Sequence, residues 1–509
     1  MRSLISILFV CLCLTAQAAR QKTHRKSDSP THHITRSAAA QRILFKPYIS
    51  WDAEKIYRMP VILMSFADLD FSCENPQQFY DRLFNESGYN LGQGPGCVAD
   101  YFRDQSHGKF NVVFDVVGPF KLTSNQKSKS GNNFGTSQFR DAIKLADDQL
   151  NYADYDWDGD GKAQSVIIIY AGYGGNEEED TADGCIWPNT DALYFSLDGV
   201  GIGGYSASPE LWTENTSCGI GTICHEFCHV LGLPDLYPTS GSEFSVLDEW
   251  DLMDGGNYSD HGWCPPNLSI HEREYLGWGE PEDLTKAKVI TDMPSFDSSG
   301  KAYRIVNEAY PDEYYLLENR QWEGWDFMLP NHGLLITHID FDESYWTSNS
   351  VNSNSRHHRL EYFHADNFDY DFYDELIGDD SSYGSDGRNM RLQYTSYPYI
   401  DAEGVSHDSL TDTSVPAAIL FHQRADGLLL MGKPVTAIHE EGGLLSFLYN
   451  DPPTGIASLT AETRPVAYYD LRGCMLPVPP ARGFYIIRYN DGSIKKVIDS
   501  INEKIWNEK

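Results

Sequence analysis

The sequence predicts an α/β domain built around one histidine-bearing helix, followed by a β-rich region and a small C-terminal β module. Strand-like and helix-like segments alternate up to about residue 280, and short strands with turns follow up to residue 450. The pattern H-E-x-x-H occurs at residues 225–229, within a segment that has helical spacing. Alternating strands and helices are typical of domains in which helices cover a sheet.

Periodicity places the individual elements of residues 58–280. Apolar and β-branched runs predict strands, whereas apolar residues three or four apart predict helices. The expected strands are Pro60–Phe66, Phe110–Phe120 and Ser165–Tyr170, and the expected helices are Pro76–Phe84, Val98–Gln105, Phe139–Leu150, Cys218–Leu231 and Ser269–Leu276.

Residues 281–450 contain shorter runs and more turns. The expected strands are Lys288–Ile290, Ala302–Val306, Tyr314–Glu318, Leu334–Ile339 and Leu444–Tyr449. The segment from Asp366 to Gly387 is acidic and rich in aromatic residues, and we expect it to be a solvated loop. This region is attached to the first one or wrapped round it, and no internal repeat is visible.

Composition limits the classes of partner. The 509-residue chain has a formal net charge of −35 and a hydrophobic content of 41%. Its length leaves room for about two to four domains. Nucleic acids and anionic membrane surfaces are bound through basic patches, so this charge argues against both. The balance fits a soluble exported protein.

The N-terminal residues have the features of an export signal. Arg2 precedes an apolar run from Leu4 to Leu14, and Ala16-Gln17-Ala18 forms a cleavage site, so residues 1–18 are expected to be removed. A lipid-anchored Cys11 or Cys13 is the alternative. Export would place the protein outside the cell or at its surface, and no later stretch has the character of a transmembrane anchor.

Residues 19–57 are expected to be a pro-segment or a flexible leader. The segment is initially basic and rich in serine, threonine and histidine, which do not build a core. It contains no cysteine, which excludes inhibition of a metal by a cysteine thiolate from this segment. If the segment does inhibit a metal, a carboxylate such as Asp28 or Asp52 would have to do so.

Eight cysteines follow the signal, and some could pair in an oxidising compartment. Cys224 and Cys228 flank the histidines but share a different face of the expected helix. We therefore expect them to be apolar packing residues rather than metal ligands.

Residues 451–509 alternate apolar residues with turn glycines, which predicts a small antiparallel β module. The pattern resembles the C-terminal sorting domains of the Bacteroidetes type IX secretion route, which would make that machinery a partner. The chain continues for eleven residues, Asp499–Lys509, where such domains usually stop. A β module without a sorting role is the alternative.

The most informative segment is His225-Glu226-Phe227-Cys228-His229-Val230-Leu231-Gly232-Leu233-Pro234-Asp235. Histidines four residues apart lie on one helix face and can both reach one zinc ion. Gly232 permits the helix to end, and Asp235 beyond it can supply a third ligand. The alternative to a metal site is a histidine pair buried in an ordinary amphipathic helix.

A second feature supports the metal site. Met253 lies in the glycine-rich stretch Trp250-Asp251-Leu252-Met253-Asp254-Gly255-Gly256, which has the form of a Met-turn beneath zinc ligands. Gly232 and Met253 together favour Asp235 as third ligand. Glu272 and Glu274 on the later helix remain alternatives.

These residues and several further motifs resemble the immune inhibitor A family of secreted zinc metallopeptidases. The resemblance spans roughly residues 58 to 450 and includes Met59–Asp68, Val98–Ser106, Phe114–Pro119, Tyr155–Gly161, Ile186–Pro188, Leu317–Gln321, Gly333–Asp340 and Pro434–Ile438. It implies an α/β zincin-like (metzincin-like) catalytic domain at 58–280, a zinc cofactor, and protein or peptide substrates.

The expected chemistry is hydrolysis of peptide bonds by a zinc-activated water, with Glu226 as general base. Tyr258 or Tyr237 could donate a hydrogen bond to the oxyanion. Two other classes stay open: an inactive exported binding protein, and a zinc hydrolase acting on another bond, such as a glycan acetyl group. The intact histidines and Glu226 argue against the first class, and the family resemblance argues against the second.

A second ion site is predicted in the segment Asp156-Trp157-Asp158-Gly159-Asp160-Gly161. Carboxylates at i, i+2 and i+4 followed by glycine match the start of a calcium loop. Ile167 stands where an EF-hand would have its bidentate glutamate, so another carboxylate such as Asp154 would be needed. A plain Asp/Gly turn is the alternative.

Overall fold

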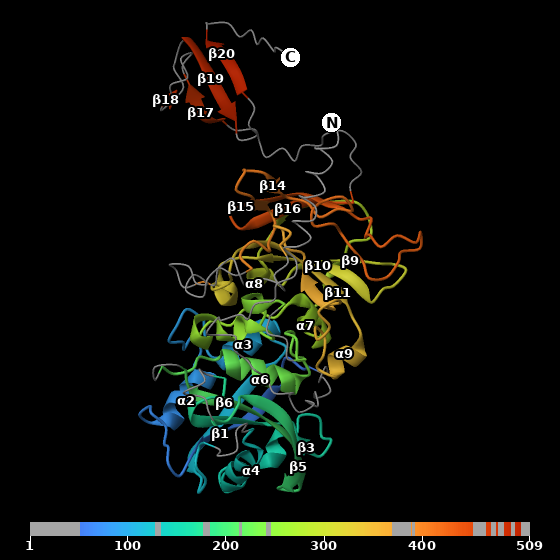
Figure 1. Ribbon diagram of the computed structural model, residues 1–509. Coiled ribbons are helices and arrows are strands. Elements are labelled where there is room, and N and C mark those ends of the chain that lie inside the picture. Colours follow the sequence, from blue (N-terminus) through green and yellow to red (C-terminus); the bar gives the residue numbers. More distant parts are fainter. Residues whose placement is uncertain are drawn as a thin grey trace, which may run out of the picture. The chain divides into compact units, whose positions relative to one another are not determined.

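The computed structural model describes residues 51–127, 134–176, 184–212, 216–240, 246–368, 388 and 392–450, together with four strands between 465 and 499. The chain divides into two compact units, Met1–Asn450 and Asp451–Lys509 (Figure 1). The expected signal at 1–18, nearly all of the leader at 19–57 and most of the acidic loop at 366–387 lie outside the described residues.

A mixed sheet forms the centre of the first 280 residues. Its order is β2-β1-β4-β6-β3, with β5 paired to β6 on the other side. Strands β1, β2, β4 and β6 run parallel to one another, whereas β5 is antiparallel to β6. The strands are β1 (Ile56–Ser65), β2 (Asn111–Lys121), β3 (Lys162–Ala163), β4 (Val166–Tyr173), β5 (Asn189–Leu197) and β6 (Val200–Leu211).

The three strands expected in this region are confirmed as β1, β2 and β4. Strands β5 and β6 were not predicted. β6 contains Gly201, Gly203 and Gly204 and two serines, so it lacks the apolar run on which the prediction depended. Its place between β4 and β5 makes it a strand despite this weak propensity.

Helices cover both faces of the sheet (Figure 1). Side chains of α2, α3 and α6 share one core with Met59, Val61 and Leu63 of β1. Side chains of α4 share a second core with Ile62 and Met64, which point to the opposite face. The helices are α2 (Pro76–Asn85), α3 (Val98–Gln105), α4 (Thr136–Leu145), α6 (Gly221–Leu231) and α7 (Ile270–Tyr275).

All five expected helices are present, but two boundaries were wrong. Helix α4 lies at 136–145 instead of 139–150, because it begins directly after Gly135 and a turn at residues 146–149 follows it. Helix α6 begins at Gly221 and not at Cys218. The Cys218 amide donates to the Glu210 carbonyl and the Gly219 amide to the His261 carbonyl, so both are tied to other segments.

The described residues between 281 and 450 form three sheets. One has the order β12-β11-β10-β9-β7, a second β15-β16-β8, and the third pairs β13 with β14. The strands are β7 (Glu282–Asp283), β8 (Lys288–Met293), β9 (Ala302–Val306), β10 (Glu313–Arg320), β11 (Gly333–Asp340), β12 (Leu360–Tyr362), β13 (Tyr399–Ile400), β14 (Ser406–His407), β15 (Val435–Glu441) and β16 (Leu444–Tyr449). The expected β-rich character is confirmed, with two short helices, α8 (Phe296–Ser299) and α9 (Glu343–Thr347), between strands.

One core crosses the expected boundary at residue 280. Phe102 and Phe227 of the first region share a buried cluster with Phe296, Leu316 and Leu335 of the second. A further cluster lies wholly within the β-rich region. The two regions are therefore packed as parts of one unit.

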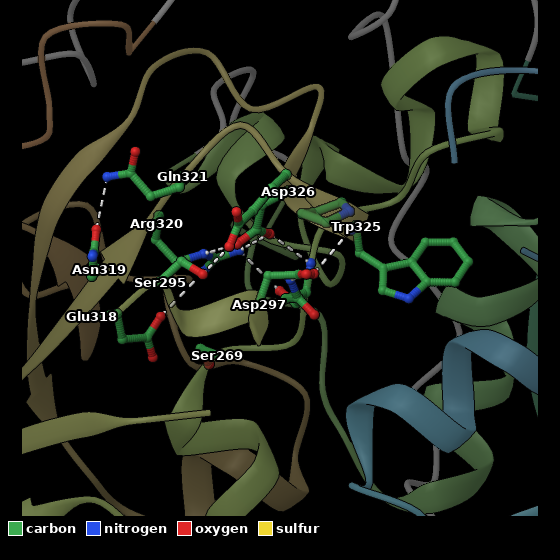
Figure 2. Close-up of polar contacts among 12 residues, drawn as sticks. Ser269, Ser295, Asp297, Glu318, Asn319, Arg320, Gln321, Trp325 and Asp326 are labelled. Carbon is green, nitrogen blue, oxygen red and sulfur yellow. Dashed lines mark hydrogen bonds and ion pairs between the residues drawn. The ribbon is translucent and has the colours of Figure 1, made fainter. Parts of the chain in front are cut away.

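A buried polar network reinforces that packing (Figure 2). Arg320 on β10 donates through Nε and Nη2 to both carboxylate oxygens of Asp326 at 2.6 Å, and through Nη1 to Glu318 at 3.2 Å. Glu318 accepts from the amide of Ile270 at the start of α7, and Asp326 accepts from the amide of Asn267. The network thus joins the Leu317–Gln321 motif to the segment that leads into α7.

The second unit contains an antiparallel sheet of order β18-β17-β19-β20. Its strands are β17 (Pro465–Tyr469), β18 (Met475–Leu476), β19 (Gly483–Tyr489) and β20 (Ile494–Asp499). The predicted antiparallel β module is confirmed, and a sorting role for it stays a prediction.

Among the described residues, no helix has both the length and the apolar character needed to cross a membrane. Cys73, Cys97, Cys224, Cys228 and Cys264 are free thiols.

The Arg320 network generates a stability prediction. Replacing Arg320 by leucine leaves Glu318 and Asp326 buried without their cation, so the free energy of unfolding should fall by about 3–5 kcal/mol. Urea unfolding of the purified protein measures this loss. Arg58→Ala breaks the exposed Arg58–Asp115 pair and should change stability by at most about 1 kcal/mol. Similar small losses in both variants would contradict a central role for the buried network.

Candidate metal centre and active site

Helix α6 carries two of the proposed metal ligands. His225 and His229 lie four residues apart, and their rings meet edge to face with centroids 4.9 Å apart. Every residue of the helix is buried. Phe227, Cys224 and Cys228 belong to the core shared with the sheet, and burial raises the pKa of both thiols well above its usual value. The two cysteines are therefore neutral packing residues, as the sequence indicated.

Backbone carbonyls fix the orientation of both imidazoles. His225 Nδ1 lies 2.9 Å from the carbonyl oxygen of Leu252, and His229 Nδ1 lies 2.8 Å from that of Leu233. A carbonyl only accepts, so each Nδ1 carries a proton and donates it. Nε2 is then the nitrogen of each ring that remains to bind a metal, and it lies beside Asp235.

Asp235 completes a three-ligand arrangement. Its Oδ1 lies 3.2 Å from Nε2 of His225 and 3.2 Å from Nε2 of His229. Ligands about 2.0–2.1 Å from a tetrahedral zinc are about 3.3–3.4 Å apart, so these separations match such a site. Each of these two contacts needs a proton or a cation between the nitrogen and the carboxylate oxygen. The residues thus fit a zinc ion.

Glu226 faces the same point from the neighbouring helix position. One ligand atom each of His225, Glu226 and His229 lies within 4.8 Å of the others. Thr190 on β5 donates its hydroxyl towards Oε2 of Glu226 at 2.9 Å and towards the Glu226 carbonyl at 2.7 Å. The edge strand of the sheet therefore orients this buried carboxylate.

The chain beyond α6 folds back to deliver Asp235. Gly232 adopts φ +104°, a left-handed conformation that glycine takes without strain, and ends the helix. The Leu236 amide then donates to the carbonyl of Met253 at 2.8 Å. Met253 is fully buried, and its neighbour Leu252 supplies the carbonyl that holds His225. The expected Met-turn thus contacts both the helix and the Asp235 loop through its backbone.

The alternative third ligands are engaged elsewhere. Glu272 Oε2 accepts from the amide and hydroxyl of Ser269 at the start of α7. Glu274 forms an ion pair with Arg304 at 2.8 Å. The geometry favours Asp235, whose Oδ1 lies beside both histidines, over either glutamate.

The two tyrosines considered for the oxyanion lie in different places. The ring of Tyr258 packs against Trp212 with centroids 5.2 Å apart, and its hydroxyl lies 3.4 Å from Nδ2 of Asn176. Tyr237 is buried two residues beyond Asp235. A role for either tyrosine in oxyanion binding stays a prediction.

The predicted calcium loop brings its carboxylates together. One oxygen each of Asp156, Asp158 and Asp160 lies within 4.8 Å of the others. Asp156 accepts from the amides of Gly159 and Gly161 at 2.8 and 2.9 Å, which curls the loop around its carboxylate. Asp158 and Asp160 are exposed. The arrangement is compatible with an ion and also with a simple turn.

The sequence did not indicate two residues that contact the site. Thr190 lies on a strand that was not predicted, and Asn349 lies 114 positions from Asp235, to which it donates a hydrogen bond. Neither residue belongs to a motif. Only the folded arrangement identifies them.

Comparisons with known proteins confirm the family resemblance for this region. Residues 64–278 match the model of the immune inhibitor A peptidase M6 catalytic domain. The match includes the helix with both histidines, the Asp235 loop and the Met-turn. Residues 64–278 are therefore similar to the metallopeptidase catalytic domain of that family.

Two relatives extend the comparison. The pre-pro-metalloprotease PrtV of Vibrio cholerae serotype O1 is 24% identical over an alignment of 305 residues that covers 50% of this chain and 32% of PrtV. Immune inhibitor A of Bacillus thuringiensis subsp. alesti is 28% identical over an alignment of 266 residues that covers 42% of this chain and 39% of that protein. The chain therefore spans 32–39% of the length of these two relatives.

The buried state of Glu272 generates a pH prediction. Desolvation by burial raises the pKa of Glu272 from 4.5 to about 7. The folded protein therefore keeps a proton that the unfolded chain loses, so stability falls as the pH rises from 4.5 to about 7. Glu272→Gln removes this titration and should reduce the loss of stability between pH 5 and pH 8, measured by urea unfolding of the metal-free protein.

Glu86→Gln is the control for this measurement. Arg82 lowers the pKa of Glu86, which is exposed, so this group titrates below pH 5 and should not alter the difference. A Glu272→Gln variant with the parental pH dependence would contradict the assignment of a buried proton to Glu272.

Proposed function

We propose that the protein is an exported zinc-dependent endopeptidase with a zincin-like, metzincin-type catalytic domain at residues 58–280. The observation that carries the proposal is the convergence of His225 Nε2, His229 Nε2 and Asp235 Oδ1, beside the buried carboxylate of Glu226. The family match over residues 64–278 supports peptide-bond hydrolysis as the reaction.

Each residue has a defined part in this reaction. His225, His229 and Asp235 would hold zinc, which supplies Lewis acidity that polarises a peptide carbonyl and lowers the pKa of water. Glu226 accepts the proton of the attacking water and passes it to the leaving amine nitrogen. Thr190 keeps the Glu226 carboxylate in place through its hydroxyl. Tyr258 remains our candidate for donating to the oxyanion.

The position of β5 favours peptides as substrates. In the described part of the chain, β5 pairs with β6 alone, and Thr190 near its start touches the catalytic glutamate. An extended peptide can add to such a strand edge through main-chain hydrogen bonds, which bring its amide groups towards Glu226. This arrangement suits a peptide better than a glycan acetyl group, which has no backbone to pair with the strand.

Calcium and export complete the proposal. Asp156, Asp158 and Asp160 would share a calcium ion that stiffens the loop before β3. Residues 1–18 would direct export, with release to the medium or retention at the cell surface. Type IX machinery would be a partner if the C-terminal module is a sorting domain.

The catalytic proposal is tested at Glu226. Replacing Glu226 by glutamine preserves shape and leaves the three ligands intact, so zinc content should stay near one per chain. Hydrolysis of casein should fall at least about a hundredfold, because the general base is lost. Atomic absorption and a fluorescent-casein assay measure the two quantities.

Two further variants separate the roles. His229→Ala removes a ligand and should lower zinc content and activity together. Glu274→Gln alters a competing candidate ligand and should leave zinc content and activity near those of the parent. A Glu226→Gln variant that retains both zinc and near-parental cleavage would show that the proposed mechanism is wrong.

The calcium proposal is tested by thermal stability. An ion that binds only the folded state raises the melting temperature, so calcium should raise the parental midpoint. Asp158→Ala should abolish this increment. Asp148→Ala, which removes an exposed carboxylate outside the loop, should retain it. Equal increments in all three proteins, measured by differential scanning calorimetry, would leave the loop as a turn without an ion.

A further inference from the structure

The β-rich region contacts the metal centre directly through Asn349. Asn349 follows α9, and its side chain meets Asp235 at two points. Its Nδ2 donates to Asp235 Oδ2 at 2.7 Å, and its Oδ1 accepts from the Asp235 amide at 2.6 Å. Asp235 is 1% exposed and Asn349 is 6% exposed, so water competes little for these contacts.

The two oxygens of the Asp235 carboxylate have different partners. Oδ2 is held by the amide of Asn349, whereas Oδ1 lies 3.2 Å from the Nε2 atoms of both histidines. Without this hydrogen bond, rotation of the carboxylate group could turn either oxygen towards the metal position. The amide of Asn349 therefore selects which oxygen faces the metal position.

Asp235 needs this support because no regular element holds it. His225 and His229 are positioned by α6, but residues 233–236 have no regular secondary structure. The loop is instead fastened to the segment around Asn349. Trp346 Nε1 donates to the Gly232 carbonyl at 3.3 Å, Thr239 Oγ1 to the Asn349 carbonyl at 2.6 Å, and Asn352 Nδ2 to the Leu236 carbonyl at 2.8 Å.

Asparagine is suited to hold Asp235 from position 349 for two reasons. Its backbone is left-handed, with φ +55°, a conformation that asparagine tolerates better than most residues. Its amide also offers one donor and one acceptor, which match the carboxylate oxygen and the amide of Asp235. An aspartate of the same shape would place a second carboxylate against the first.

We propose that Asn349 is a positioning residue for the zinc ligand Asp235, so that the segment after α9 is part of the metal centre. This inference rests on the zinc site of the proposed function. Outer partners of metal ligands typically contribute a factor of about 10–100 to metal affinity. We expect a loss of that size when Asn349 is replaced.

The test measures zinc affinity by competition with a chromogenic chelator. Asn349→Ala and Asn349→Asp should weaken zinc binding about 10–100-fold, the second although it preserves shape. Thr239→Ala is the matched control, since it removes a hydrogen bond to the same segment but leaves the amide of Asn349 in place. It should bind zinc within about threefold of the parent. Circular dichroism melting of the metal-free proteins reports whether each variant folds.

A zinc titration of casein cleavage supplies the second readout. If Asn349 acts through Asp235, added zinc restores activity to Asn349→Ala, with a half-maximal concentration raised by the same factor as the dissociation constant. A general folding defect would not be reversed in this way. Parental zinc affinity in both Asn349 variants, or equal losses in Thr239→Ala, would overturn the inference.

These outcomes are distinct from failure of the proposed function. A parent that binds zinc but cleaves no protein refutes the peptidase proposal, while the affinity comparison still decides the role of Asn349. A parent that cleaves casein while the Asn349 variants bind zinc normally refutes only the inference. A parent without zinc affinity overturns both.

Discussion

The candidate site depends on the placement of one carboxylate oxygen, Asp235 Oδ1, beside the Nε2 atoms of two histidines. His225 Nε2 and His229 Nε2 each lie 3.2 Å from Asp235 Oδ1, while their Nδ1 atoms are occupied by backbone carbonyls. All three side chains are almost fully buried, so a proton or a cation between nitrogen and carboxylate oxygen is needed to make these contacts favourable. The surrounding contacts hold the side chains in an arrangement that fits the zinc ion we propose there. If zinc binds as proposed, metal binding and the stability of this region are thermodynamically linked.

Support for the cluster comes from elements far apart in sequence. Strand β5 contributes Thr190 to Glu226, the Met-turn contributes the Leu252 carbonyl to His225, and the segment after α9 contributes Asn349 to Asp235. The last of these belongs to the β-rich region, whose side chains share a core with α6. The ion pair of Arg320 and Asp326 anchors the same region to the chain before α7. A catalytic domain ending at residue 280 would lack both the shared core and the partner of Asp235.

Local sequence patterns predicted the elements whose own residues carry a clear helical, strand or turn pattern. The H-E-x-x-H spacing, Gly232 and the apolar runs of β1, β2 and β4 each follow from short-range physics, and the structure has these elements where they were expected. Strand β6, rich in glycine and serine, is a strand because of its neighbours. The sequence favoured Asp235 as third ligand through Gly232 and Met253, but spacing left Glu272 and Glu274 as alternatives. The choice among them depends on which carboxylates find other partners, Ser269 for Glu272 and Arg304 for Glu274.

Charge balance explains why this chain can bury so many carboxylates. Glu318 and Asp326 both bind the guanidinium of Arg320. Burial raises the pKa of Glu272 to about 7, so this carboxyl group can be buried with its proton. Glu226 and Asp235 lie beside the two histidines of the proposed metal site. A divalent zinc held there, as we propose, would place a positive charge next to both carboxylates. Asn349 and Thr190 add hydrogen bonds but no charge. In this proposal the positive charge at the site therefore comes from the metal ion and not from these two hydrogen-bonding partners.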